Sequence, residues 1–120
     1  MEELKLGKAQ ARFADIIWKN EPLSSRTLVA ICKEELDWKK STTYTVLKQL
    51  CEKGLFRNEG GIVSSQITQE EYASAQCEKF VEDTFGGSLA AFLKAFTRRK
   101  KLSDSDVAEI QKMIQQVESK

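Results

Sequence analysis

The clearest chemical pattern in the sequence is a polar segment that contains almost no acid, from Ser41 to Gln49. If this segment is helical and Leu47 lies at the centre of its buried side, a rotation of about 100° per residue places Thr43, Leu50 and Cys51 on that side as well. The opposite side then carries hydroxyl, amide and ammonium groups, with a phenol on its flank. These residues are Ser41, Thr42, Thr45, Lys48 and Gln49, with Tyr44 on the flank.

Side chains of these types can donate hydrogen bonds to phosphates or contact base edges, and nearby acids do not repel a nucleic-acid backbone. The stretch from Asp37 to Asn58 has five basic and two acidic side chains, a local charge of +3. Threonine is a poor helix former, so a purely solvated helix has little reason to carry it three times within residues 42–45. The segment therefore predicts a DNA-binding surface, to which we assign Lys39, Lys40, Ser41, Thr42, Tyr44, Thr45, Lys48, Gln49 and Arg57.

The simpler alternative is an ordinary solvated helix face, because threonine and lysine are common at protein surfaces. Arg57 fits a phosphate contact and simple solvation equally well. The basic run Arg98–Lys101 lies outside the predicted surface and is typical of a solvated loop rather than of a second nucleic-acid patch.

Catalytic chemistry finds little support in the composition. The chain has no histidine, which removes the commonest general base and zinc ligand. Cys32, Cys51 and Cys77 are widely spaced and form no C-x-x-C pair, so we expect reduced, buried thiols rather than a redox or metal site. We therefore predict no enzyme activity, no catalytic or metal-binding residues and no cofactor.

Three helices and a hairpin would position the predicted surface. Apolar residues at helical spacing predict a helix over residues 8–20, which Pro22 prevents from continuing. A second helix is expected within residues 23–36 with Ser24 as its N-cap, and a third over 41–54, ending at Gly54. Strands at 55–58 and 62–67 would flank the turn Glu59-Gly60-Gly61.

This order, three helices followed directly by a β-hairpin, is typical of a winged helix-turn-helix, in which the third helix enters the DNA major groove. We therefore predict a mainly α fold with a winged-helix domain over residues 1–68. Trp18 and Trp38 lie at helix junctions, where an aromatic ring more often fixes one helix against another than stacks on a base.

Residues 69–120 predict a helical dimerisation domain. Thr68 and Glu71 form a capping box that opens a helix running to Phe85, and Ser88 and Ser103 are expected to begin two more. So short a segment rarely builds a sufficient core alone, which favours pairing with a second copy. Its phenylalanines could instead line a ligand pocket. The predicted dimer interface consists of Phe80, Phe85, Leu89, Phe92, Phe96, Val107, Ile110 and Ile114.

The whole chain has 120 residues and a formal charge of +1, which suits one domain or two small lobes and gives no strong overall field. It has no apolar run near the ~20 residues that span a bilayer and no apolar signal core at its start. We therefore expect a cytoplasmic protein that does not insert into membranes.

Four stretches together resemble the penicillinase repressor family, of the BlaI/MecI type. They are Trp38-Lys-Lys-Ser-Thr-Thr-Tyr-Thr-Val-Leu, Leu50-Cys-Glu-Lys-Gly-Leu, Ile17-Trp18 ahead of Pro22-Leu23-Ser24, and Phe85-Gly-Gly-Ser-Leu. The resemblance extends from about Gly7 to the C-terminus. It implies a bacterial winged-helix transcriptional repressor that binds palindromic operators, often ahead of β-lactamase, resistance or copper-handling genes, as a homodimer joined through its C-terminal helices.

Carried over by position, the resemblance implies a DNA-contacting helix with Ser41, Thr42, Tyr44, Thr45 and Gln49. Tyr44 and Gln49 stand where some members have arginine. A protease or sensor relieves repression in some members, but their Asn-Phe cleavage site reads Ala95-Phe96 here, and the paired C-x-C motifs of copper-responsive members are absent. The inducing signal therefore stays open. The alternative to a repressor is a winged-helix adaptor that binds protein and not DNA.

Overall fold

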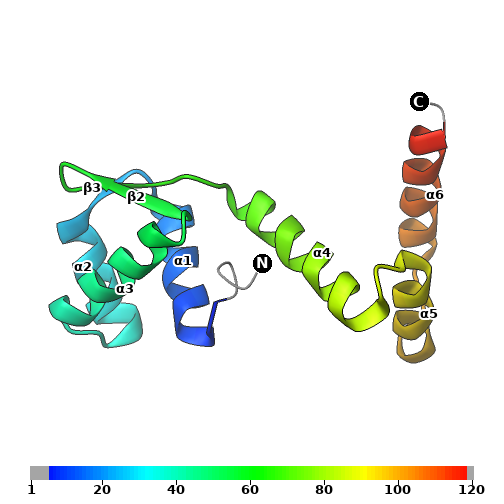
Figure 1. Ribbon diagram of the computed structural model, residues 1–120, viewed down its shortest axis with the longest axis horizontal. Coiled ribbons are helices and arrows are strands. Elements are labelled where there is room, and N and C mark those ends of the chain that lie inside the picture. Colours follow the sequence, from blue (N-terminus) through cyan, green and yellow to red (C-terminus); the bar gives the residue numbers. More distant parts are fainter. Residues whose placement is uncertain (1–5, 119–120) are drawn as a thin grey trace. The chain divides into compact units, whose positions relative to one another are not determined.

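The computed structural model describes residues 6–118 and divides into two compact units between Lys79 and Phe80. The first unit contains α1 (Lys8–Asn20), β1 (Leu23–Ser24), α2 (Ser25–Leu36), α3 (Lys40–Glu52), β2 (Phe56–Glu59), β3 (Ile62–Ser65) and the beginning of α4 (Gln69–Phe85). The end of α4, with α5 (Leu89–Arg99) and α6 (Asp104–Glu118), forms the second unit (Figure 1). The fold is mainly α with a small antiparallel sheet, which confirms the predicted winged helix.

The boundaries of α2 and α3 follow from local backbone chemistry. The Ser24 hydroxyl accepts a hydrogen bond from the Thr27 N–H at 3.1 Å, so the predicted N-cap of α2 is confirmed. Asp37 ends α2 in the left-handed region at φ 55°, and the Trp38 N–H closes the helix on the Cys32 carbonyl at 3.3 Å. Gly54, at φ 88°, lets the chain turn away after α3.

The sheet has one strand more than the predicted hairpin. Its order is β1-β3-β2, all antiparallel, and Val63 pairs with Leu23 on one side and Asn58 on the other. Gly60 and Gly61, at φ 60° and 84°, form the tight turn of the wing. The prediction missed β1 because its two residues have no alternation of their own and pair with a strand far along the sequence.

The core of the first unit lies between the helices and the sheet. Phe13 and Ile17 of α1, Leu28 of α2 and Leu50 of α3 are fully buried, and Phe56 closes the core from the sheet. The core thereby fixes the orientation of α3, since a rotation of this helix would expose Leu50 and bury polar side chains.

Both tryptophans pack inside the first unit, as predicted. The Trp38 ring stacks on Phe13, with 5.4 Å between ring centroids. Trp18 contacts Phe56 at 5.3 Å and Tyr72 at 5.5 Å, and its indole N–H donates to the Ile67 carbonyl at 3.1 Å. They are partly buried rings that join helices to the sheet and to α4.

The second unit has helices but no sealed core. None of its described side chains is buried, although Phe80, Phe85 and Phe92 form an edge-to-face cluster with centroid separations of 5.8 to 6.2 Å. The Ser88 and Ser103 hydroxyls each accept a backbone hydrogen bond, at 3.0 Å, at the starts of α5 and α6, which confirms both predicted caps.

Candidate nucleic-acid interface

The polar side of α3 faces solvent as the helical rotation predicts. Ser41, Thr42, Thr45, Lys48 and Gln49 are exposed, and we call these five residues the α3 polar face. The opposite side packs into the core through Leu47 and Leu50. No acid interrupts this face until Glu52, so hydroxyl, amide and ammonium groups are presented together.

Thr43 does not belong to the exposed surface. It is fully buried, and its hydroxyl donates to the Lys39 carbonyl at 3.2 Å, one turn earlier in the helix. The helical rotation placed Thr43 on the buried side, which is confirmed, so only Thr42 and Thr45 support the inference drawn from three closely spaced threonines. In a buried helix position, a threonine can satisfy its hydroxyl on the backbone and needs no outside partner.

The hydroxyl groups of this surface differ in the hydrogen bonds that they already make within the protein. The Thr45 hydroxyl donates to the Ser41 carbonyl at 2.9 Å, and the oxygen of this exposed side chain can still accept a hydrogen bond. Tyr44 is half-buried, and its phenol donates to the Ser25 hydroxyl at 3.1 Å, across to the first residue of α2. This bond, which no local sequence pattern indicates, holds the Tyr44 ring at the edge of the α3 polar face.

The amide at the far end of the face also has an internal contact. Gln49 Oε1 accepts a hydrogen bond from Gln10 Nε2 of α1 at 3.4 Å. The Gln49 side chain remains exposed and keeps its N–H₂ donors. No local pattern connects two residues 39 positions apart, so Gln10 is a residue of this surface that the prediction missed.

The predicted phosphate-binding cations fall into two groups. Lys39, Lys40 and Lys48 are exposed, and no ion pair within the described part of the chain engages them. Arg57 on β2 is also exposed, but its guanidinium lies 3.7 Å from the Glu59 carboxylate on the same strand. An exposed pair of this kind is weak, so Arg57 can exchange Glu59 for another anion at small cost.

A hollow of about 380 Å³ separates α3 from the wing. Tyr44, Lys48 and Asn58 line it together with Leu47 and Cys51. Asn58 was not among the predicted residues, because its place opposite Lys48 depends on how the hairpin folds back along α3. Its amide adds a donor and an acceptor on the wing side of the α3 polar face.

The cysteines differ from the predicted set of buried thiols. Cys32 is buried, and burial raises the pKa of its thiol to about 11, against a hydrogen bond with Thr43 that lowers it. Burial also raises the pKa of the half-buried Cys51. Cys77 is exposed on α4, so for this residue the expectation was wrong. It lies on the solvent side of a helix that packs only its other face.

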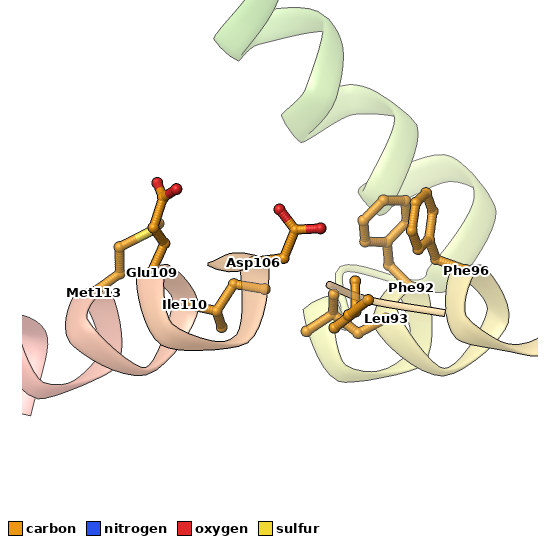
Figure 2. Close-up of a pocket in the computed structure, with 8 residues that line it drawn as sticks. Phe92, Leu93, Phe96, Asp106, Glu109, Ile110 and Met113 are labelled. Carbon is orange, nitrogen blue, oxygen red and sulfur yellow. The ribbon is translucent and has the colours of Figure 1, made fainter. Parts of the chain in front are cut away.

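The predicted dimer residues occupy the surface of the second unit. Phe80, Leu89, Phe96, Val107 and Ile114 are exposed by 39 to 61%. Phe85, Phe92 and Ile110 are half-buried. Figure 2 shows Phe92, Phe96 and Ile110 around a groove of about 340 Å³ between α5 and α6, with the carboxylates of Asp106 and Glu109 directed to one side of it. Most of the residues that line this groove are apolar.

The described residues offer neither a metal site nor a membrane-spanning helix. Residues 6–118 contain no group of three or more His, Cys, Asp or Glu side chains that could hold a metal ion. No helix in this range has the length and apolar character needed to cross a membrane.

Comparison with known proteins gives one clear result. A family model described as penicillinase repressor matches residues 6–116, nearly the whole chain, including both units. A search of curated proteins returned no match. The family match covers the α3 polar face, the wing and the apolar helices of the second unit.

Proposed function

Because the chain belongs to the penicillinase repressor family, whose members are transcriptional repressors, we propose that it binds palindromic operator DNA as a homodimer and blocks transcription by occupying the promoter. The proposal covers a bacterial, cytoplasmic regulator of β-lactamase or other resistance genes. It performs no chemistry, because occlusion of polymerase requires only that the protein stay bound.

The observation that carries the proposal is the exposed, acid-free α3 polar face, held outward by the burial of Leu47 and Leu50. A helix of this kind fits the major groove of B-DNA, which is about 12 Å wide. Lys39, Lys40 and Lys48 supply cations beside it, and within residues 6–118 no ion pair has to be broken to free them. Counterion release by such contacts provides much of the affinity.

Sequence selectivity would come from the hydroxyl and amide groups of the same helix. Gln49 can make a bidentate contact to adenine, and the methyl and oxygen of the exposed Thr45 side chain suit a thymine methyl or a base amino group. Tyr44, tied to Ser25, would act mainly through its fixed position at the groove edge. Thr42 completes the set of predicted base contacts.

The second unit supports the dimer. Its helices leave large apolar side chains exposed and bury none of the described residues, which is typical of a surface that another subunit covers. A symmetric dimer would present two copies of α3 to successive major grooves, roughly 34–36 Å apart. We assign residues 1–68 to DNA binding and 69–120 to dimerisation.

The test is an electrophoretic shift assay with genomic fragments, including the DNA upstream of the protein's own gene, at two salt concentrations. Sedimentation of the same protein gives its oligomeric state. We expect a dimer that shifts a palindromic fragment and binds less tightly at the higher salt concentration. Failure to bind any duplex at low salt would refute the proposal and favour a protein-binding adaptor, and a stable monomer would refute the dimer.

A further inference from the structure

Two side-chain amides connect the start of α1 with the α3 polar face, and all their contacts lie inside the first unit. The Gly7 N–H, just before α1, donates to Gln10 Oε1 at 3.2 Å. Gln10 Nε2 then donates to Gln49 Oε1 of α3 at 3.4 Å. Gln10 is half-buried and Gln49 is exposed. The hydrogen bonds therefore run in one direction, from a backbone group to a side chain at the surface.

The backbone of Gly7 decides the orientation of both amides. A backbone N–H can only donate, so the Gln10 atom that faces it has to be the amide oxygen. The Gln10 amino group is then left to face α3, and it needs an acceptor there. An amide has one acceptor atom, so Gln49 meets this amino group with its oxygen. The orientation of the exposed Gln49 amide follows from these two contacts.

We infer that Gln10 is a positioning residue for base recognition, which holds the Gln49 amide in the orientation that reads adenine and rejects guanine. The inference rests on the proposed function, since it concerns α3 in a major groove. Adenine presents the N6 donor beside the N7 acceptor in this groove. The Gln49 oxygen has two lone pairs, so it can accept from Gln10 with one and from adenine N6 with the other, while its amino group donates to N7.

The fixed orientation matters most for the base that has to be rejected. Guanine presents two acceptors, O6 and N7, where adenine presents a donor and an acceptor. With the amide held by Gln10, the Gln49 oxygen would meet guanine O6, acceptor against acceptor. A free amide could turn its amino group towards O6 and reduce this penalty. Selectivity against guanine therefore depends on a residue of α1 that need not touch any base.

The substitution Gln10→Glu separates this role from support of the helix start. A carboxylate has nearly the shape of the amide, and one of its oxygens can still accept from the Gly7 N–H. Its other oxygen cannot donate, so it would repel the Gln49 oxygen and attract the Gln49 amino group. The Gln49 amide should then turn over. Gln10→Ala instead removes the contact and leaves the amide free.

The experiment uses the full chain and a palindrome that the parent protein selects from a random library. The base pair read by Gln49 is the position at which Gln49→Ala loses its preference. Fluorescence anisotropy at low salt then compares duplexes with adenine or guanine at this position. The parent should prefer adenine at least about tenfold. Gln10→Ala should reduce the preference to about threefold or less, and Gln10→Glu should abolish it.

A charge control and a folding control complete the experiment. Ala9→Glu places the same negative charge on the neighbouring exposed position of α1, so it should weaken binding to both duplexes alike and keep the parent preference. Thermal unfolding shows which variants are folded, and Gln10→Ala decides the matter if Gln10→Glu is not.

Three outcomes would overturn the inference. One is a folded Gln10 variant with the full preference of the parent. The others are a parent that prefers a base other than adenine at the position read by Gln49, and a Gln49→Ala variant that keeps every preference. In all three the protein still binds DNA, so the proposed function stands. A parent that binds no duplex refutes the proposed function itself.

Discussion

Lys48 offers the sharpest test of the proposed interface, because its ammonium group is exposed on the α3 polar face and no ion pair in the described chain engages it. Replacement by alanine keeps good helix propensity and removes one cation for each protomer. Each phosphate contact lowers the logarithm of the binding constant by about 0.9 for each tenfold rise in salt. A dimer that loses two contacts should therefore have a slope smaller by about 1.8.

The expected change in salt dependence is large enough to measure in an ordinary DNA-binding titration. When salt rises from 50 to 200 mM, a slope smaller by about 1.8 means that the affinity of the variant falls about twelvefold less than the affinity of the parent. Fluorescence anisotropy with a labelled palindrome at several salt concentrations gives the slope directly. Lys112→Ala, which removes the same charge from exposed α6, is the matched control and should retain the parent slope. A parent-like slope for Lys48→Ala would show that this ammonium contacts no phosphate.

Four other predictions concern the fold and the thiols. Phe56→Ala should lower the free energy of unfolding by about 3–5 kcal/mol in urea titrations, because the ring is fully buried; a loss below about 1 kcal/mol would contradict this role. Asp37→Gly should raise that free energy by about 0.5–1 kcal/mol, since φ is 55° there, and a destabilised variant would show that the aspartate side chain matters more than its backbone strain. Mass spectrometry after iodoacetamide treatment at pH 8 should find exposed Cys77 modified long before Cys32; equal rates would mean that the first unit opens readily. The raised pKa of Cys32, about 11, keeps its thiol protonated in the folded state while the unfolded chain ionises from about pH 9, so the free energy of unfolding should fall as pH rises from 9 towards 11.

Local patterns predicted most of the fold. The helix expected over residues 8–20 is observed as Lys8–Asn20, and Ser24, Ser88 and Ser103 each cap the expected helix. These features depend on neighbouring residues, so the sequence contains them directly. β1 was missed because a two-residue strand exists only through its pairing with β3, which lies about 40 residues away.

In the candidate interface too, features set by neighbouring residues were predicted, and features set by contacts with distant residues were not. The rotation argument placed the α3 polar face correctly, since burial of Leu47 and Leu50 fixes the opposite side. Its contacts with other helices, such as Tyr44 to Ser25 and Gln49 to Gln10, depend on tertiary packing and have no local signal. The assignment of these residues to DNA contacts stays a prediction that the binding experiments above address.

None of the side chains that the structure describes in the second unit is buried, and this has a thermodynamic consequence. Helices of 11 and 15 residues, such as α5 and α6, gain most of their stability from burying an apolar face, and here a lone chain leaves that face in water. In the proposed dimer, mass action would link the ordering of this half to the number of copies present. A cell with few copies would then hold chains with a folded first unit and a fraying second one, and occupancy of the proposed operator would rise more steeply than the copy number itself.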